Sequence, residues 1–412
     1  MASPKDPALP LFSVVFLDMV GIGIAYPVLA PLFLEDSGIL PPEASFQFRA
    51  LMLGVLISAY PVSQFFGAPV LGGLSDHYGR KKLLLVSLAG TVAGYIMFAA
   101  GIVYGSLPLM FLGRIIDGFT GGNISIALSS MADISDERSK ARNFGLIGMA
   151  FGLGFIIGPY IGGKLADPAI VPWFGYWTPF AFAALLGALN MAFLASGYRE
   201  TLRARVKTPV SLGMGFRNMA RAASIPSLRV MFLVLFLYSF GFNIYTQFFN
   251  VLLVEKFSFS QSQIGDMFAY MGFWAAITQG VLTRQVARFL LPRQVLSFSL
   301  ALLGLSVAAV MFQETPSGLL LVIPFIAAFQ GLSFPNASAL VSNLSAKDSQ
   351  GEILGITQSI QSLAQAVPPL VAGIIISFDI HLPVIASCLI ILVAWGVFAL
   401  AFRPAREVFH EV

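Results

Sequence analysis

The chain has 412 residues, of which 57% are hydrophobic and only 11% are charged, and its formal net charge is +4. Its mean hydropathy is +0.83. Soluble domains are about 45–50% apolar, so this composition excludes an ordinary soluble protein and indicates a multi-pass membrane protein. A bilayer core needs about 20 mostly apolar residues per helix. Twelve such spans can be placed, centred near residues 21, 61, 93, 119, 154, 187, 241, 273, 304, 331, 364 and 392.

The basic residues predict the orientation of these spans. With the N-terminus in the cytoplasm, Arg49, Lys164 and Lys256 face the other side and Arg114 lies within a span, while all other Lys and Arg residues are cytoplasmic. This is the positive-inside bias, so the pI near 9.2 does not indicate a nucleic-acid partner. We expect both termini to be cytoplasmic. We expect no cleaved signal peptide, because the first apolar stretch continues as a full span.

The first span carries Asp18 near its middle, with Tyr26, two glycines and two prolines further along. A carboxylate at bilayer depth costs roughly 2.5–3.5 kcal/mol on insertion scales, so it is a functional candidate by default. The glycines and prolines favour a bent helix that lines a cavity, with Tyr26 as one of its wall residues. The alternative is an acid that only bonds to a neighbouring helix.

A charged turn joins the second and third spans. It runs Gly72-Gly73-Leu74-Ser75-Asp76-His77-Tyr78-Gly79-Arg80-Lys81-Lys82. Glycines permit a tight turn and close helix approach, so we expect this turn to contact neighbouring helix ends. The pairing to test is Arg80 with Asp133, at the cytoplasmic end of the fourth span. The alternative is a solvated charged loop, worth about 0–1 kcal/mol per ion pair.

The fourth span contains Arg114 and Asp117, which are three residues apart and therefore on one helical face, near enough to pair. As a closed pair they would be structural. If protonation of Asp117 or Asp18 loosens the pair, the site becomes a proton switch, because desolvation and a nearby arginine act on a carboxylate in opposite directions. Asn123, further along this span, is a cavity candidate.

The fifth span places small residues at four-residue spacing, which lets helix backbones approach closely. The predicted packing motif consists of Gly154, Gly158, Pro159, Gly162 and Gly163. Its glycine pair after Gly-Pro is less common in membrane helices than small-residue spacing alone.

Residues 199–228 carry seven cations and interrupt the apolar pattern, so we predict a cytoplasmic linker between six-helix bundles at 1–198 and 229–412. The halves are related, since Phe16–Glu35 matches Phe236–Glu255 at six positions. Parallel repeats of this kind predict two bundles around a cavity at the membrane midplane.

The repeat also shows where charge is concentrated. Asp18 aligns with Tyr238, and Arg114 and Asp117 align with neutral residues of the second half. We infer that the first bundle handles charge and that the second mainly shapes the cavity.

The second half supplies further polar and aromatic candidates for the cavity, in which rings and hydrogen-bonding groups stand side by side. They are Tyr238, Phe242, Asn243, Tyr245, Gln247 and Asn250 in the seventh span, and Gln279, Gln330, Gln358 and Gln361 in later spans. The amides among them are equally able to hold helices together.

Three of these segments resemble motifs of one family. The turn from Gly72 to Lys81 resembles the signature loop of the major facilitator superfamily, and the Asp18–Pro31 and Gly154–Gly163 segments resemble motifs of its twelve-span drug:proton antiporters. Bacterial tetracycline exporters look nearest, through Gly113-Arg114-Ile115-Ile116 and Ala132-Asp133-Ile134. The chain departs from the family pattern at His77, which usually is a basic residue, at Asp117, which usually is neutral, and at Gly94, where the tetracycline exporters have an acid.

The resemblance implies an all-α membrane protein with twelve helices in two pseudo-repeat bundles, and proton-coupled efflux by alternating access. The gate latch it implies comprises Gly72, Asp76, Gly79, Arg80, Lys81 and Asp133. We therefore expect a monomeric secondary transporter in a bacterial inner membrane, rather than an enzyme. It would be driven by the proton gradient without a cofactor or metal, and its partners would be protons, the lipid bilayer and an amphipathic, cationic or zwitterionic small molecule. The alternatives are a metabolite, amino-acid or siderophore carrier working as importer or uniporter, and a non-transporting receptor.

Overall fold

The computed structural model describes residues 8–135, 140–202, 211–226, 228–344 and 350–402, and its regular elements in these ranges are all helices. The N-terminal half comprises α1 (Ala8–Leu34), α2 (Phe46–Tyr78), α3 (Arg80–Val103), α4 (Leu107–Thr120), α5 (Asn123–Asp133), α6 (Lys140–Ala166) and α7 (Thr178–Gly197). A short helix, α8 (Met214–Ser224), follows. The C-terminal half comprises α9 (Arg229–Phe257), α10 (Gln261–Ile277), the π-helical turn η1 (Thr278–Leu282), α11 (Thr283–Val286), α12 (Pro292–Ala309), the 3₁₀ turn η2 (Val310–Phe312), α13 (Pro316–Asn343), α14 (Gln350–Ala366), α15 (Pro368–Ile375) and α16 (Leu382–Ala401).

Within the described ranges, nine helices are individually long and apolar enough to cross a membrane. Three further crossings are broken into pieces: α4 with α5, α10 with η1 and α11, and α14 with α15. Two of the breaks have a local cause, since Gly121 and Gly122 separate α4 from α5 and the Pro368-Pro369 step begins α15. Counted together, the nine single helices and the three broken crossings are consistent with the twelve predicted spans.

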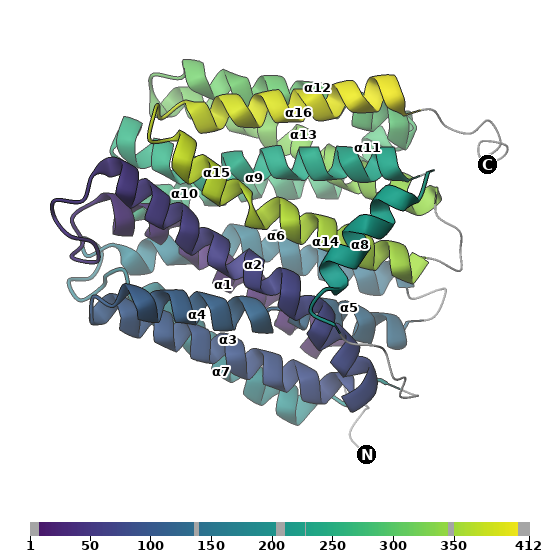
Figure 1. Ribbon diagram of the computed structural model, residues 1–412, viewed down its shortest axis with the longest axis horizontal. Coiled ribbons are helices and arrows are strands. Elements are labelled where there is room, and N and C mark those ends of the chain that lie inside the picture. The colour runs from purple at the N-terminus through teal and green to yellow at the C-terminus, as the bar shows by residue number, and fades with distance from the viewer. Residues whose placement is uncertain (1–7, 136–139, 203–210, 227, 345–349, 403–412) are drawn as a thin grey trace.

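The two halves lie side by side with their helices nearly parallel (Figure 1). Both described chain ends and α8 lie at one end of the molecule, on the right in Figure 1, which we call the linker side. The connections after α1, α3, α6, α9, η2 and α15 lie at the opposite end, which we call the loop side.

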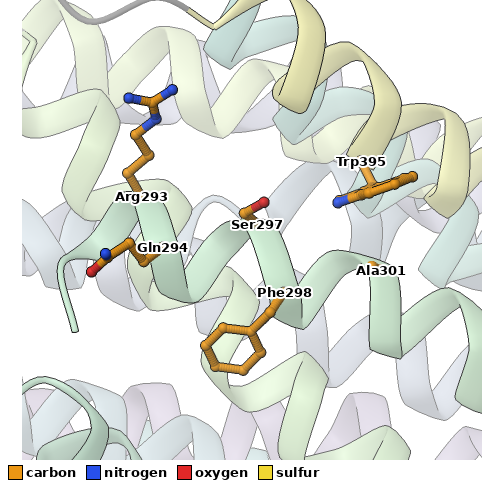
Figure 2. A pocket seen from close by; sticks show the side chains of 6 residues that line it. All are labelled: Arg293, Gln294, Ser297, Phe298, Ala301 and Trp395. Atoms are coloured by element: carbon orange, nitrogen blue, oxygen red, sulfur yellow. The ribbon is translucent and has the colours of Figure 1, made fainter. Parts of the chain in front are cut away.

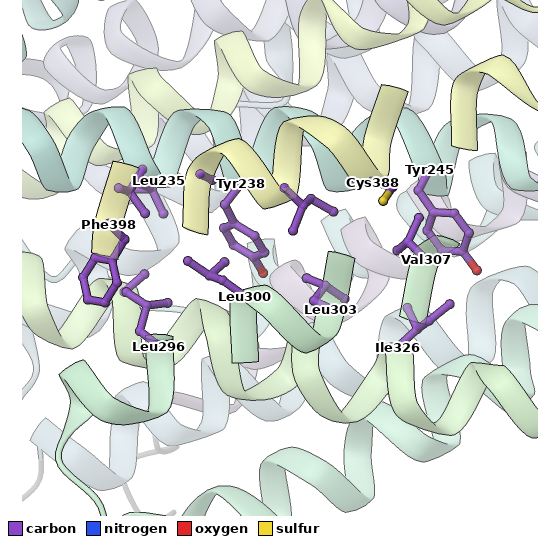
Figure 3. Close-up of a cluster of buried hydrophobic side chains, with 14 of the residues drawn as sticks. Leu235, Tyr238, Tyr245, Leu296, Leu300, Leu303, Val307, Ile326, Cys388 and Phe398 are labelled. Atoms are coloured by element: carbon purple, nitrogen blue, oxygen red, sulfur yellow. The ribbon is translucent and has the colours of Figure 1, made fainter. Parts of the chain in front are cut away.

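Each half has its own apolar core. In the C-terminal half, Leu235 and Tyr238 of α9 pack with Leu300 of α12 and Phe398 of α16 (Figure 3). Large apolar side chains also point outward on the same helices, for example Leu389, which is 57% exposed in the absence of a bilayer. An apolar outer surface over an apolar core is expected for helices whose solvent is lipid.

The helix linking the halves, α8, bridges them at the linker side. Its Phe216 packs edge-on against Phe65 of α2, with ring centroids 5.2 Å apart. Its Asn218 donates a hydrogen bond of 2.9 Å to Ser359 of α14. The predicted linker at 199–228 thus contains a helix that contacts both bundles.

Candidate functional site

The buried polar groups of the N-terminal half gather around Asp18, which is only 6% exposed. Asn123, at the start of α5, is fully buried and donates a hydrogen bond of 2.8 Å to one carboxylate oxygen of Asp18. The break between α4 and α5 places this amide next to α1. In this conformation Asn123 holds Asp18 and does not line an open cavity, which corrects the expectation for Asn123.

Arg114 is buried on α4, but its guanidinium faces rings and not a carboxylate. Its central carbon lies 5.2 Å from the ring centroid of Phe98 and 5.9 Å from that of Tyr60. Among the residues that the structure describes, no ion pair joins Arg114 to Asp117. The closed pair, one of the two alternatives drawn from the sequence, is therefore not formed in this conformation, and the arginine makes cation–π contacts instead.

Asp117 is 3% exposed and lies against α3 at Gly94. A Cβ atom at Gly94 would lie 2.7 Å from the Cβ of Asp117 and 2.8 Å from the carbonyl oxygen of Gly113. Two departures from the family pattern, the missing acid in the third span and the additional acid in the fourth, thus face one another. One carboxylate occupies this interface, contributed by α4.

Two buried tyrosines complete what we call the polar cluster: Asp18, Tyr60, Tyr95, Arg114, Asp117 and Asn123. The charges of Asp18, Asp117 and Arg114 all act on the hydroxyl groups of Tyr60 and Tyr95. Neither Tyr60 nor Tyr95 was predicted from the sequence as a site residue. The one available signal was Gly21, whose missing side chain leaves room for the Tyr95 hydroxyl group.

Several atoms of the polar cluster lack a partner. In the described part of the chain, one carboxylate oxygen of Asp18, the amide oxygen of Asn123 and Nε of Arg114 are buried without a hydrogen bond. Buried polar atoms are nearly always satisfied, so each exception calls for an explanation. A bound proton or ligand is the explanation that such groups most directly offer.

The C-terminal half contributes neutral groups to the centre. Tyr238, which is aligned with Asp18 in the repeat, interacts through its hydroxyl with the side chain of Gln330. Asn243 donates to the backbone oxygen of Ser239 one turn earlier on the same helix. Four other candidates are partly buried in this conformation: Phe242, Gln247, Gln358 and Gln361. Gln279, in η1, is exposed.

Asn250 joins the halves and does not line a cavity in this conformation. Its amide donates a hydrogen bond of 2.8 Å to the backbone oxygen of Tyr26 in the other half. The Tyr26 ring stacks on Phe268 of α10, with centroids 5.2 Å apart, and Tyr245 packs against Phe249 of the same aromatic group. These rings lie toward the loop side of the polar cluster, since Tyr26 follows Asp18 by two turns of α1.

The halves meet closely at the loop-side part of α6 and α10, and also where Gly54 of α2 faces Gly373 of α15. Gly163 and Gly265 face one another, and a Cβ atom at Gly163 would overlap the carbonyl oxygen of Gln261. On the linker side of the same helices, Gly152 of α6 and Gly280 of η1 have no atom within 4 Å of an added Cβ. The two helices thus diverge toward the linker side, and a gap between the halves opens there along α6 and α10.

Polar contacts reinforce the closed loop side. Lys164 of α6 contacts both Asp266, at 2.9 Å, and Ser262, at 2.6 Å, in the other half. The hydroxyl of Tyr176 donates to Glu35, at 2.8 Å, and accepts from Gln261 across the interface, at 3.0 Å. Burial and this bond to the Glu35 carboxylate raise the pKa of Tyr176.

The glycines of the α6 motif contact two different neighbouring helices. Gly158 and Gly162 face α1, where added Cβ atoms would lie 2.6 Å from the oxygen of Val20 and 2.5 Å from that of Ile24. Gly154 also faces α1, and Pro159 packs on Gly23. Of these glycines Gly163 faces the other half, so the glycine pair lets α6 contact both bundles at one level.

At the linker side, Arg80 is buried between two carboxylates. It lies 2.6 Å from Asp76, one turn earlier, and 3.1 Å from Asp133 at the end of α5. It also donates a hydrogen bond of 2.6 Å to Ser75. The pairing proposed from the sequence is thus formed, and it connects the α2–α3 turn to α5 within the N-terminal half.

The turn itself depends on Gly79 and on a residue that sequence analysis did not select. Gly79 has φ +104°, a conformation that favours glycine. Glu200, just after α7, accepts hydrogen bonds from the backbone N–H groups of Arg80, at 2.9 Å, and Lys81, at 3.1 Å, and so caps α3. An added Cβ at Gly79 would lie 2.5 Å from the Glu200 carboxylate. Lys81 bonds the carbonyl oxygen of Ala195, and Gly72 faces Ser125 of α5.

Comparison with known proteins agrees with this architecture. The model of the Major Facilitator Superfamily matches residues 11–251 and again residues 231–411. The chain is 30% identical over 368 residues to "Tetracycline resistance protein, class C" of Escherichia coli, which covers 88% of this chain and 87% of that protein. It is 30% identical over 354 residues to "Major facilitator superfamily domain-containing protein 10" of Homo sapiens, and the match covers 79% of this chain and 74% of that protein.

Solved structures share the fold. The crystal structure of the human organic anion transporter MFSD10 (TETRAN) superposes with a TM-score of 0.71 at 23% identity, covering 95% of this chain and 98% of that chain. The crystal structure of a D-xylose-proton symporter superposes with a TM-score of 0.76 at 16% identity, covering 98% of this chain and 99% of that chain.

Proposed function

The chain belongs to the major facilitator superfamily and is a membrane transporter rather than an enzyme, and we propose that it is a proton-coupled antiporter that exports an amphipathic small molecule. The observation that carries this proposal is the polar cluster. Its two carboxylates and one arginine are buried in one half, whereas the aligned positions of the other half are neutral. Charged groups inside a membrane protein mark ion and substrate pathways.

The chemistry of the polar cluster supports coupling by protons. A buried carboxylate without a cation partner is costly when charged, and it loses that charge on binding a proton. Asp18 has one unpartnered oxygen and one neutral donor, Asn123. Exchange of a proton at Asp18 for a positively charged substrate group would keep the net charge of the site constant in both directions of transport.

The arrangement of the halves supports alternating access. We propose that the linker side is cytoplasmic, because the basic residues concentrate there, and that this structure is the inward-facing state. The loop side is closed by Lys164, Asp266 and the aromatic group around Tyr26. In this state these contacts would separate the polar cluster from the outer side of the membrane. The outward-facing state would require these contacts to break while the linker side closes.

The substrate we propose is cationic or zwitterionic and carries apolar rings. The two carboxylates would receive its positive group, and the aromatic side chains Tyr26, Phe155 and Phe268 offer stacking partners for its rings. Relatives named as tetracycline resistance proteins support a drug-like export substrate. Several of these relatives come from bacteria, which supports a bacterial inner membrane as the location.

A second candidate substrate class is an organic anion. The observation that favours it is Arg114, whose charge is buried over rings without an ion-pair partner in the described structure. A relative with a solved structure is named as an organic anion transporter. In that case Arg114 would bind the substrate directly, and Arg114→Gln would abolish binding while Asp18→Asn would leave it intact.

Transport by the purified protein in liposomes tests the proposal. With a pH-sensitive dye inside energised vesicles, adding a drug-like cation should release protons, and a pH gradient alone should drive accumulation. A uniporter would transport the same compound without responding to the gradient, and an importer would move it with protons. Either result would replace antiport with the corresponding alternative. We also propose that the protein is a monomer and that it needs no cofactor. Measuring the size of the reconstituted protein tests the monomeric state, and transport by the purified protein without additions tests the need for a cofactor.

A further inference from the structure

A groove between α12 and α16 lies on the outer surface of the C-terminal half, away from the polar cluster. It has a volume of about 540 Å³ and is lined by Arg293, Gln294, Ser297, Phe298, Ala301 and Trp395 (Figure 2). This volume is within the range of small-ligand sites, about 300–1,000 Å³. None of the transport features described above includes these residues.

The groove has a local structural origin. At the level of Gly304 the two helices touch, since an added Cβ there would lie 2.8 Å from the side chain of Leu392. Toward the linker side the surface between them is hollowed, and at Gly396 no atom of the described residues lies within 4 Å of an added Cβ. The groove therefore opens between the first turns of α12 and the last turns of α16.

The walls of the groove face the hydrocarbon of the bilayer. Along the same two helices, Leu305, Leu389 and Val393 are each more than half exposed in the isolated chain. Phe298 and Ala301 follow Arg293 by five and eight residues, so at 1.5 Å per residue they lie about 7–12 Å deeper along α12. The groove thus runs from the membrane surface into the apolar layer.

Its mouth carries a positive charge. Arg293 is exposed at the second position of α12, and its guanidinium lies 5.9 Å from the ring centroid of Phe402 at the end of α16. Gln294 adds an amide, and Trp395, which is 38% exposed, points its indole nitrogen toward Ser297 (Figure 2). Among the described residues that line the groove, every charged or hydrogen-bonding side chain is therefore a cation or a possible donor, and none is a carboxylate.

We propose that this groove binds an anionic phospholipid. The phosphate group lies against Arg293 and Gln294 at the membrane surface, and one acyl chain fills the groove along Phe298 and Trp395. Basic pockets between helices at the cytoplasmic side of a membrane recognise lipid headgroups in this way. The proposal rests on the surface of the C-terminal half alone and does not depend on the transported molecule.

The chain contains its own control site. A groove of about 500 Å³ between α3 and α7 is lined by apolar side chains together with Tyr104 and Trp177, without a cation. It also faces lipid, but it offers an anionic headgroup no opposite charge. We expect this control groove to bind acyl chains without preference for the headgroup.

Tryptophan quenching by brominated lipids tests the proposal. The chain has four tryptophans, so two single-tryptophan variants are made in which Trp395 or Trp177 alone remains and the others are changed to Phe. In vesicles, brominated phosphatidylglycerol should quench Trp395 with about fivefold higher apparent affinity than brominated phosphatidylcholine, the effect of about one surface cation. Trp177 should be quenched equally by the two lipids.

Two arginine variants test whether Arg293 causes the preference for phosphatidylglycerol. Arg293→Gln should remove the fivefold difference at Trp395, whereas Arg288→Gln, an exposed arginine of the same region outside the groove, should leave it intact. Equal quenching of Trp395 by both lipids, or a preference that survives Arg293→Gln, would overturn the proposal. Displacement of the brominated lipid by millimolar inorganic phosphate would also overturn it, since the site would then be one for free anions.

Native mass spectrometry of the chain with all four tryptophans provides a readout that does not depend on the Phe substitutions. The parent protein should retain one more phosphatidylglycerol molecule than the Arg293→Gln variant during release from detergent. Equal numbers of bound lipids in the two proteins would contradict the proposed site.

Discussion

Asn123 and Asp18 are joined by a hydrogen bond of 2.8 Å that connects α5 to the middle of α1 inside the N-terminal half. The bond is possible because the fourth crossing is broken just before Asn123, so that the first turn of α5 meets α1. The remaining oxygen of Asp18 has no partner within the described residues. One oxygen of this carboxylate is thus positioned by the protein, and the other is the atom at which we propose that a proton or a substrate group binds.

We expect Asp18→Asn to abolish uptake driven by a pH gradient into inverted vesicles, while counterflow of substrate continues. Asparagine keeps an oxygen that can accept the bond from Asn123, so folding should be preserved, but it cannot exchange a proton. Measurement of both transport modes in the same vesicles checks this. Uptake that still follows the pH gradient would remove Asp18 from coupling, and Asn123→Ala, which retains the carboxylate, should remain coupled.

We expect Asp76→Asn to slow transport roughly tenfold without changing which compounds bind. Asp76 lies 2.6 Å from Arg80 in this conformation. Losing this charge-assisted hydrogen bond, worth about 1.5 kcal/mol, in only one of the two conformational states changes the free-energy difference between the states by that amount. Initial transport rates and equilibrium binding of the same substrate series separate the two effects. Altered substrate selectivity would contradict the role of Asp76 in the gate, and Asp36→Asn, at the loop side, is the control substitution.

The fold was largely predictable from the sequence because apolar length and charge placement are local signals. Asp18, Arg114 and Asp117 were also found, since ionisable residues are rare inside apolar spans. Of the two alternatives for Arg114 and Asp117, the closed pair is not formed in this conformation. Helical spacing shows that two side chains share a face, but it does not show that aromatic rings from α2 and α3 will contact the guanidinium group of Arg114.

Contacts between distant segments were not predictable. Glu200 caps α3 from a position 120 residues further along the chain than Arg80, and nothing in the sequence around either residue indicates the other. The same holds for Lys164 and Asp266, whose pairing depends on how the two halves meet. The glycines were visible as small residues, but their different neighbours, α1 for Gly162 and α10 for Gly163, required the structure.

We expect Gly94→Ala to destabilise the protein, because its Cβ would be forced to within 2.7 Å of Asp117 at the α3–α4 interface. Overpacking of this kind costs about 1–3 kcal/mol, which exceeds the gain of about 0.8–1.0 kcal/mol from alanine in a helix. Gly396→Ala, with open space around it, should instead leave stability unchanged or raise it. Midpoints of thermal unfolding in detergent compare the two variants, and equal midpoints would contradict the proposed close packing at Gly94.

We expect Gly163→Ala to shift the protein away from the conformation described here. The added methyl group would overlap the carbonyl oxygen of Gln261, in the part of the interface that closes the loop side. A strain of about 1–3 kcal/mol present only in this state changes the equilibrium between states by about 5–150-fold. The state with an open loop side and a closed linker side should become more populated.

Cysteine labelling from the linker side measures this shift. The single cysteine, Cys388, is removed as Cys388→Ser, and Gly148→Cys places a reporter at an exposed position of α6 with open space around it. A membrane-impermeant maleimide should label this reporter several-fold more slowly when Gly163→Ala is added. Gly152→Ala, on the same helix but facing open space, is the matched control and should leave the rate unchanged. If both substitutions slowed labelling equally, or if neither did, the contact between Gly163 and α10 would not determine which side is open.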